Sequence, residues 1–306
     1  MNIKKLMVVF GLVASIGMVL SACGGGSGDG GNSAEGSKEI TVSSKNFTEN
    51  IILAHMMADL IEAKTDIKVT RTVNLGGSNV VWNALKNNEV QLFPDYTGTI
   101  VANYYQEETG TSEESLTRSR ELMKEDGLAF LEPFGINNTY TLAVTQETAE
   151  KHNLKTFSDL AEVSDDMVLG VEFEFLDRDD GYPGIRELYG MNFKDSKGMD
   201  HGIMYQAIDN GETDVTNAYA TDAQIAVHNL VILEDDKQFF PPYDGGPVIR
   251  QDTLDQYPEL EEVLNLLGGQ LTEADMQELN AQVDVEGLRE DSVARDFLVQ
   301  KGLIEE

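Results

Sequence analysis

The amino-acid sequence predicts an α/β protein of two lobes with a ligand cleft between them. The length of 306 residues is enough for two ordinary domains or one large two-lobed one. The composition, with 41% hydrophobic and 25% charged residues, is close to that of globular proteins. Strand-like and helix-like segments alternate from Ile40 onward, and the alternation resumes at Tyr140.

The first part of this alternation has the order strand, helix, strand, helix, strand. Ile40 and Val42 lead a short strand, and the chain then enters a helix near Asn46. This helix extends to Ala63 without proline or glycine, although its apolar residues follow the helical period only partly. The later expectations are a strand over 67–73, a helix over 79–86 capped by Ser78, and a strand over 90–93 ended by Pro94. Such an order implies a mostly parallel sheet covered by helices.

The second part repeats the alternation. Strand-like segments lie at 140–144, 167–173, 215–218 and 230–233, and helical stretches lie around 157–163, 184–189 and 203–210. The end of the chain, from Leu254 to Ile304, is rich in helical pattern. Two α/β lobes joined by crossing strands account for this order with the fewest assumptions.

The chain is strongly acidic, with 22 Lys and Arg against 54 Asp and Glu and a formal net charge of −32. Such a surface repels phosphate backbones, and the sequence contains no basic cluster that would compensate. Nucleic-acid binding and electrostatic docking of the folded body onto anionic lipid are therefore disfavoured. The acidity also suggests adaptation to high salt as a hypothesis.

The N-terminal segment has the pattern of a secretory signal. Lys4 and Lys5 precede an apolar run over 6–20, which is short for a membrane span of roughly 20 apolar residues. The run is followed by Leu-Ser-Ala-Cys, which resembles the lipobox of bacterial lipoproteins. Cys23 is the only cysteine and cannot form an internal disulfide, so lipid attachment explains it better than a chance cysteine beside an ordinary cleavage site. The expected organisation is a signal peptide over 1–22 and a lipidated Cys23 that begins a flexible tether over 23–39.

The sequence lacks the familiar motifs of enzymes and metal sites, such as G-x-S-x-G, H-E-x-x-H, the P-loop and C-x-x-C. Its histidines stand apart from one another and are expected in packing or at the surface: His55, His152, His201 and His228. The acidic run over 177–180 lacks the spacing of a calcium loop and is expected to be a solvated turn. We therefore predict no catalytic residue, no metal site and no cofactor.

Four turns contain a tyrosine, and two fall in each half of the chain. They are PDYTGT over 94–99, NNTY over 137–140, NAYATD over 217–222 and PPYDG over 241–245. Tyr96 and Tyr219 each lie just past a predicted strand, at the carboxyl end where open α/β sheets bind ligands. A single tyrosine in such a place usually contributes only to packing. The prediction of a binding site therefore depends on the four tyrosines taken together.

Four motifs in this order make the chain similar to a known family. They are SKNFTE over 44–49, FPDYTGT over 93–99, EFLDRDDG over 174–181 and AYATD over 218–222. From Ile40 to its end the chain resembles the substrate-binding lipoproteins of ABC importers for quaternary-ammonium osmoprotectants, the glycine betaine, carnitine and choline group. The resemblance implies a two-lobed periplasmic-binding-protein fold of type II. Lobe 1 would comprise 40–142 plus 245–306, and lobe 2 would comprise 143–244.

The resemblance also implies a cage of tyrosine rings around a trimethylammonium group. The matching positions are Tyr96, Tyr140, Tyr219 and Tyr243. A quaternary ammonium has no N–H to donate, but aromatic faces attract it by about 0.5–2 kcal/mol per ring. Four rings supply on the order of 2–8 kcal/mol, whereas micromolar binding needs about 8 kcal/mol, so a second anchor is expected.

In betaine or carnitine the second anchor must meet a carboxylate. The resemblance places Arg178, Lys45 and Thr99 in this role, and the planar guanidinium of Arg178 suits two oxygens. Two alternatives stay open: Arg178 merely forms a surface pair with its aspartate neighbours, or Ser44 or Asn46 replaces Lys45.

The implied function is extracytoplasmic capture of a quaternary-ammonium solute, with glycine betaine favoured, for an ABC permease in osmoprotection. The protein would be held at the cell membrane by its lipid anchor alone and would carry out no catalysis. The alternatives are a binder of choline or of another small cationic or amino-acid solute, and a sensor or adhesin domain coupled to no transporter.

Overall fold

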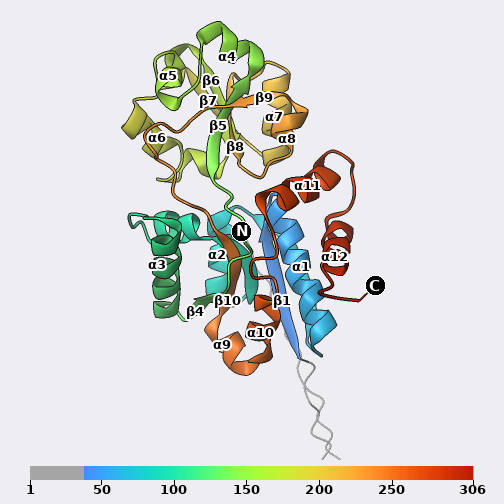
Figure 1. Ribbon diagram of the computed structural model, residues 1–306. Helices are drawn as coiled ribbons and strands as arrows, with labels where there is room; N and C mark the ends of the chain where they lie inside the picture. Colours follow the sequence, from blue (N-terminus) through green and yellow to red (C-terminus); the bar gives the residue numbers. More distant parts are fainter. Residues whose placement is uncertain (1–37, 306) are drawn as a thin grey trace, which may run out of the picture. The chain divides into compact units, whose positions relative to one another are not determined.

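The computed structural model describes residues 38–305, and these contain two five-stranded β-sheets, each covered by helices (Figure 1). The predicted signal peptide and the lipidated Cys23 lie outside the described residues, as does nearly all of the predicted tether. In the part of the chain that the structure describes, no helix combines the length and the apolar character that a membrane crossing requires.

The first sheet has the strand order β2-β1-β3-β10-β4. Its strands are β1 (Glu39–Lys45), β2 (Lys68–Gly76), β3 (Leu92–Tyr96), β4 (Leu128–Phe130) and β10 (Gly245–Arg250). β1 pairs in parallel with β2 and β3, whereas β10 enters between β3 and β4 and is antiparallel to both. We call this sheet and its helices lobe A.

The second sheet has the order β7-β6-β8-β5-β9. Its strands are β5 (Tyr140–Thr145), β6 (Val168–Glu172), β7 (Asp195–Met199), β8 (Val215–Tyr219) and β9 (Leu230–Ile232). β6 is parallel to β7 and β8, and β5 is antiparallel to β8 and β9. We call this sheet and its helices lobe B.

The two sheets therefore share one plan, in which three parallel strands are followed by an antiparallel strand that arrives from the other sheet. This confirms the predicted α/β class with crossing strands. The crossings lie between β4 and β5 and between β9 and β10. β5 belongs to the second sheet from Tyr140 onward, so the predicted boundary after residue 142 falls inside this strand.

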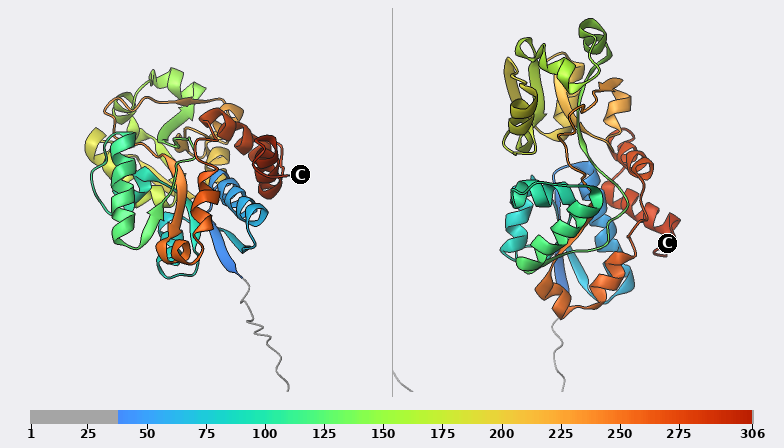
Figure 2. Two further views of the ribbon diagram at one scale, coloured as in Figure 1. Left: turned by 60° about the horizontal axis from the view of Figure 1, so that its bottom comes forward. Right: turned by 60° about the vertical axis from the view of Figure 1, so that its left-hand side comes forward.

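Helices of lobe A enclose its sheet and build the larger apolar core. They are α1 (Thr48–Lys64), α2 (Ser78–Lys86), α3 (Ser112–Glu125), α9 (Gln251–Gln256), α10 (Glu259–Asn265), α11 (Glu273–Asp284), α12 (Glu290–Gln300) and the π-helix η1 (Thr99–Tyr104). α1 contacts β1 and β2 as well as α10, α11 and α12, and Figure 2 shows it beside these C-terminal helices. Because α1 is covered on opposite sides, its apolar residues depart from a single helical stripe.

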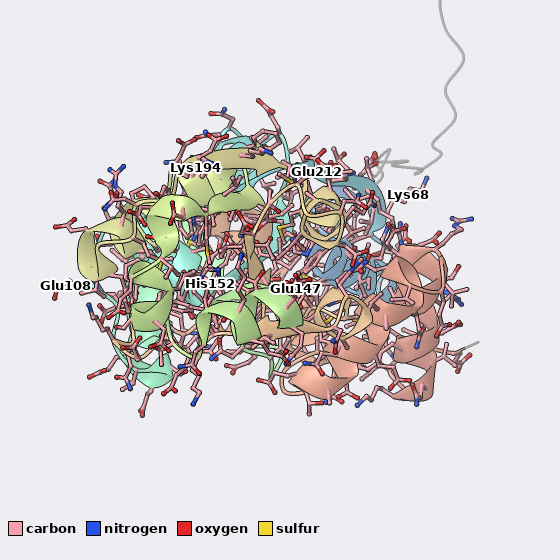
Figure 3. The ribbon with its side chains drawn as sticks, turned by 90° about the horizontal axis from the view of Figure 1, so that it is seen from above. Lys68, Glu108, Glu147, His152, Lys194 and Glu212 are labelled. Carbon is pink, nitrogen blue, oxygen red and sulfur yellow. The ribbon has the colours of Figure 1, made fainter. Side chains whose placement is uncertain are left out.

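Lobe B has shorter helices. They are α4 (Gln146–His152), α5 (Phe157–Ala161), α6 (Tyr182–Tyr189), α7 (His201–Asp209), α8 (Gln224–Val227) and the 3₁₀ turns η2 (Ser164–Asp166) and η3 (Glu174–Leu176). The charged surface is visible in Figure 3, where Glu147 and the half-buried His152 lie on α4, and the exposed Glu108, Lys194 and Glu212 lie elsewhere on the surface.

Two local expectations were wrong. The N-cap of α2 is Gly77, and Ser78 is the first helical residue, whose backbone N–H and hydroxyl both donate to Glu174 of lobe B. Pro94 does not end its strand, because β3 continues to Tyr96. Pro94 faces Pro247 in a position of the antiparallel ladder where neither residue needs an N–H for pairing, so both prolines are tolerated.

Candidate functional site

The seven residues predicted to bind the ligand line one small cavity between the two lobes. They are Lys45, Tyr96, Thr99, Tyr140, Arg178, Tyr219 and Tyr243. The cavity measures about 10 Å³, so the side chains around it are almost in contact. Its wall also contains three residues that the sequence did not single out as ligand contacts: Phe47, Asn138 and Glu174.

Strand ends position the four tyrosines. Tyr96 and Tyr219 are the last residues of β3 and β8, and Tyr140 is the first residue of β5. Tyr140 and Tyr219 are directly paired across the antiparallel strands of lobe B. Tyr243 lies two residues before β10, on the second crossing between the lobes. Residues that are distant in sequence therefore meet at the facing edges of the sheets.

The rings contact one another closely. The ring centre of Tyr140 lies 4.9 Å from that of Tyr219 and 5.4 Å from that of Tyr243, the latter at an angle of 88°. Phe47 adds a fifth ring from lobe A, and its centre lies 5.2 Å from Tyr219 and 6.3 Å from Tyr96. We call these five rings the cage. Edge-to-face and offset contacts of this kind stabilise aromatic clusters.

Buried carboxylates accept hydrogen bonds from the phenols of the cage. Tyr219 donates to Glu172 at 2.6 Å, and Tyr243 donates to Asp180 at 2.8 Å. Burial and the neighbouring carboxylates raise the pKa of both phenols well above the ordinary value, so the rings are neutral at physiological pH. A phenol that donates to a carboxylate is polarised toward an electron-rich ring, which suits attraction of a cation.

Arg178 is buried, with 3% of its surface exposed. Its Nε and Nη2 donate to the two oxygens of Asp180, and Nη1 donates to the Ser78 hydroxyl at 3.1 Å. Nη2 also lies 3.4 Å from the hydroxyl of Thr99. The pairing with an aspartate neighbour was anticipated as an alternative, but as an exposed surface pair. The structure instead buries the pair inside the predicted site.

Lys45 is buried and forms an ion pair with Asp95, with 2.7 Å between Nζ and Oδ1. The ammonium also lies 5.1 Å from the ring centre of Tyr96. Of the two alternatives to Lys45, the Ser44 hydroxyl is used in a hydrogen bond to the Lys45 carbonyl, and Asn46 lines a neighbouring cavity. Both basic residues of the predicted anchor are thus neutralised by carboxylates of the protein itself.

Glu49 is a buried acid that sequence reasoning missed as part of the site. Its Oε1 accepts hydrogen bonds from the Tyr96 hydroxyl at 2.6 Å and from the Asn138 amide at 2.8 Å. Burial raises the pKa of Glu49 to about 7, with the charge of Asp222 adding to the effect. The only signal in the sequence was its place in the motif over 44–49.

His201 is buried beside the cage rather than at the surface or in ordinary packing. Its ring stacks on Tyr219 with 5.2 Å between ring centres, and it lies between Asp222 at 3.1 Å and Glu172 at 3.3 Å. Burial opposes its protonation, but these two carboxylates outweigh burial and hold the pKa of His201 well above the ordinary value. The isolated position of His201 in the sequence concealed this arrangement, which forms only after folding.

No cluster of three or more metal-ligating side chains that could hold an ion occurs among residues 38–305. The arrangement can bind a compact cation against aromatic faces and can offer Arg178 and Thr99 to an acidic group.

Comparison with known proteins gives consistent matches over nearly the whole described chain. The family described as the substrate binding domain of ABC-type glycine betaine transport system matches residues 38–300. The carnitine transport binding protein OpuCC of Listeria monocytogenes is 33% identical over 307 residues, which cover 99% of this chain and 98% of that protein. A crystal structure described as a glycine betaine/carnitine/choline ABC transporter has a TM-score of 0.68 at 33% identity, and the match covers 86% of this chain and 99% of that one.

One relative is considerably longer. The ergothioneine transport permease/ergothioneine binding protein EgtU of Helicobacter pylori is 34% identical over 267 residues. The match covers 87% of this chain but 48% of that protein, so this chain spans about half the length of that relative.

Proposed function

The chain belongs to the family of substrate-binding domains of ABC-type glycine betaine transport systems, and from that premise we propose that it captures a small quaternary-ammonium solute for an ABC importer, with glycine betaine favoured. The observation that carries the proposal is the cage, in which rings from both lobes surround one cavity together with Arg178 and Thr99. The family is one of transport proteins rather than of enzymes.

The chemistry of the cage suits a trimethylammonium group. Such a group has no hydrogen to donate, so it gains more from electron-rich ring faces than from hydrogen-bond acceptors. The hydroxyls of Tyr96, Tyr219 and Tyr243 are already engaged with carboxylates, which leaves the faces of the rings for the ligand. A cavity of about 10 Å³ cannot hold glycine betaine, so binding requires the rings to move apart and to close again around the solute.

The carboxylate of glycine betaine would compete with Asp180 for Arg178. Both are carboxylates, and the ligand carboxylate would take over the Nη1 and Nη2 donors of the guanidinium that now reach Ser78 and Thr99. Thr99 and Lys45 would complete the anchor. Ligand contacts to both lobes would favour the closed arrangement that a permease recognises.

Choline is the second candidate, and a specific observation favours it. Lys45 and Arg178 are each paired with an aspartate, and the carboxylates of Glu172 and Glu174 lie beside the cage in addition. The surroundings therefore contain more acids than bases, which favours a ligand with a net positive charge over a zwitterion.

Calorimetric titration of the purified protein with glycine betaine, carnitine and choline tests the proposal. We expect glycine betaine to bind, and we expect Arg178→Ala to weaken it by about tenfold or more while choline loses little, because only betaine has a carboxylate for the guanidinium. Tyr219→Ala should weaken both ligands, because both present the same trimethylammonium group to the rings.

Equal losses of glycine betaine and choline in Arg178→Ala would contradict the assigned anchor. Tyr219→Phe is the matched control for the cage, because it keeps the ring and removes only the hydroxyl that donates to Glu172. Absence of binding by all three ligands in the unmodified protein would overturn the proposed function.

Substrate-binding proteins of ABC importers act outside the cytoplasm, and we propose that this chain is held there by a lipid on Cys23. The support is the sequence pattern that ends at this residue. In cell fractionation, Cys23→Ala should move the protein from the membrane fraction to the soluble fraction. Retention in the membrane would contradict the anchor.

A further inference from the structure

Helix α11 of lobe A reaches across to lobe B. It packs on α1 and α12, which both belong to lobe A, and Figure 1 shows it at the boundary between the two lobes. Two of its side-chain amides nevertheless donate to backbone carbonyls of lobe B: Gln277 to Ala220 at 2.9 Å and Asn280 to Thr221 at 3.0 Å. We call these two hydrogen bonds the latch.

The latch holds the turn that follows Tyr219, the last residue of β8. This turn is closed on itself, because the Tyr219 N–H donates to the Asp222 carboxylate and the Asp222 N–H donates to the Tyr219 carbonyl. Ala220 and Thr221 are the middle residues of the turn, and α11 binds the carbonyls of both. The Tyr219 ring contacts Phe47 of lobe A, so α11 holds a cage ring of lobe B against one of lobe A.

The two bonds of the latch differ in burial. Asn280 and Thr221 are both buried, and a buried carbonyl that loses its donor is costly because no water replaces the missing partner. Gln277 is exposed, so water can take the place of its amide at Ala220. The latch therefore has a strong inner bond at Asn280 and a weak outer bond at Gln277.

The N-terminus of α11 is attached near the first crossing between the lobes. Glu273 accepts a hydrogen bond at 3.2 Å from the backbone N–H of Asn137, which lies on that crossing. At a rise of 1.5 Å per residue, Asn280 lies about 10 Å farther along the helix. A hinge motion at the crossing therefore displaces the lobes more at Asn280 than at Glu273. A hydrogen bond of 3.0 Å is lost when its atoms separate by about 1 Å more, so opening of the lobes breaks the inner bond.

We propose that Gln277 and Asn280 are positioning residues that favour the closed arrangement of the lobes without touching the solute. The inference rests on the proposed function, because it requires solute binding to favour the same arrangement. Neither residue lines the cage cavity or the neighbouring cavity that Arg178 also lines. Because the latch forms only when the lobes are closed, its loss lowers the closed fraction and thereby weakens every solute by the same factor.

Calorimetric titration with glycine betaine and choline tests the equal factor. Asn280→Leu keeps the branched shape of the side chain and removes the amide, and it should weaken both solutes alike by about fivefold or more. Gln277→Ala should weaken both by about twofold, because water replaces the exposed donor. Gln282→Ala is the matched control, since Gln282 lies on the same helix and its side chain forms no hydrogen bond among the described residues. It should leave both affinities unchanged.

Small-angle X-ray scattering reports the arrangement of the lobes directly. Without solute, Asn280→Leu should have a larger radius of gyration than the unmodified protein, because more of its molecules are open. With saturating glycine betaine the two proteins should have the same radius, because solute contacts then close the lobes. A role of Asn280 in stability alone would change the melting temperature but not this difference in radius.

Three results would overturn the latch and leave the proposed function in place. Unequal losses of glycine betaine and choline in Asn280→Leu would indicate a direct contact with one solute. Unchanged affinities and an unchanged radius would show that the inner bond does not affect closure. A loss of the same size in Gln282→Ala would assign the effect to the helix in general. Absence of binding by both solutes in the unmodified protein overturns the proposed function, and the comparison of radii without solute then supports or overturns the latch by itself.

Discussion

Around the cage, buried carboxylates accept hydrogen bonds from the tyrosine hydroxyls. These bonds determine which atoms of the tyrosines remain available to a ligand. Tyr96 donates to Glu49, and Tyr219 donates to Glu172. The hydroxyl of Tyr140 lies 3.3 Å from that of Tyr219 and is the donor of this pair, because the single hydrogen of the Tyr219 hydroxyl is given to Glu172. With these oxygens engaged inside the protein, the free recognition surface consists of ring faces, which distinguish a quaternary ammonium from a hydrogen-bonding amine.

Glu49 makes the stability of the protein depend on pH. Its pKa of about 7 in the folded state lies above the value near 4.3 of an unfolded chain. Between these values the folded state holds a proton that the unfolded state has lost, so stability falls as pH rises through this range. Glu49→Gln stays neutral and still accepts from Tyr96. We therefore expect it to exceed the unmodified protein in stability by about 3 kcal/mol near pH 8 and to equal it near pH 4.

Urea denaturation of both proteins at several pH values measures this difference. The exposed Glu89→Gln is the matched control, because it removes the same charge without changing a buried group. A difference between Glu49→Gln and the unmodified protein that stays constant from pH 4 to pH 8 would contradict the assignment.

Among the secondary-structure elements, the turn from β3 into η1 brings Tyr243 against lobe A. A Cβ atom built on Gly98 would lie 2.7 Å from the ring of Tyr243 and 2.8 Å from the carbonyl oxygen of Pro242. Glycine therefore permits the close approach between the first sheet and the second crossing. The backbone at Gly98 is right-handed helical, so the requirement is for space rather than for an unusual conformation.

Gly98→Ala is therefore expected to destabilise the protein by about 1–3 kcal/mol through overpacking and to weaken ligands that use Tyr243. Thermal unfolding and calorimetric titration measure the two effects. Gly202→Ala on α7 is the control, since a Cβ atom there meets nothing within 4 Å and alanine favours the helix by about 0.5–1 kcal/mol. Unchanged stability in Gly98→Ala would show that the turn adjusts without cost.

The sequence predicted the elements whose signals are local. Alternation located β1, β2, β5, β6 and β8. The family motifs and the tyrosine-bearing turns together located seven of the ten residues that line the cavity. The insertion of β10 between β3 and β4 was not predicted, because pairing between distant strands leaves no local pattern. The same reason explains why the contacts of His201 and Glu172 with Tyr219 were not predicted. Neither residue is distinctive alone in the sequence, and only the parallel packing of β6 with its neighbours brings them to Tyr219.

At the scale of the whole molecule, the net charge of −32 creates repulsion that salt can screen. We expect the melting temperature to rise when NaCl increases from about 10 mM to about 1 M, because the screening length falls from about 30 Å to about 3 Å. A variant with three exposed acids replaced, Glu261→Gln, Glu262→Gln and Glu278→Gln, should show a smaller rise, since none of these residues forms an ion pair among the described residues. An equal rise in both proteins would assign the effect to salting-out rather than to charge.

The two crossings between the lobes are joined to each other and also carry cage rings. Asn137 pairs with Asp244 in an isolated bridge, and the Asn138 N–H donates to the Tyr243 carbonyl at 3.0 Å. Tyr140 follows the first crossing directly, and Tyr243 lies on the second. Both crossings therefore lead directly into rings of the recognition surface, so we expect a rotation of one lobe against the other to change the arrangement of these rings. A fluorophore pair placed to report the angle between the lobes would consequently measure the fraction of protein that holds a solute. Neither fluorophore would need to lie near the solute.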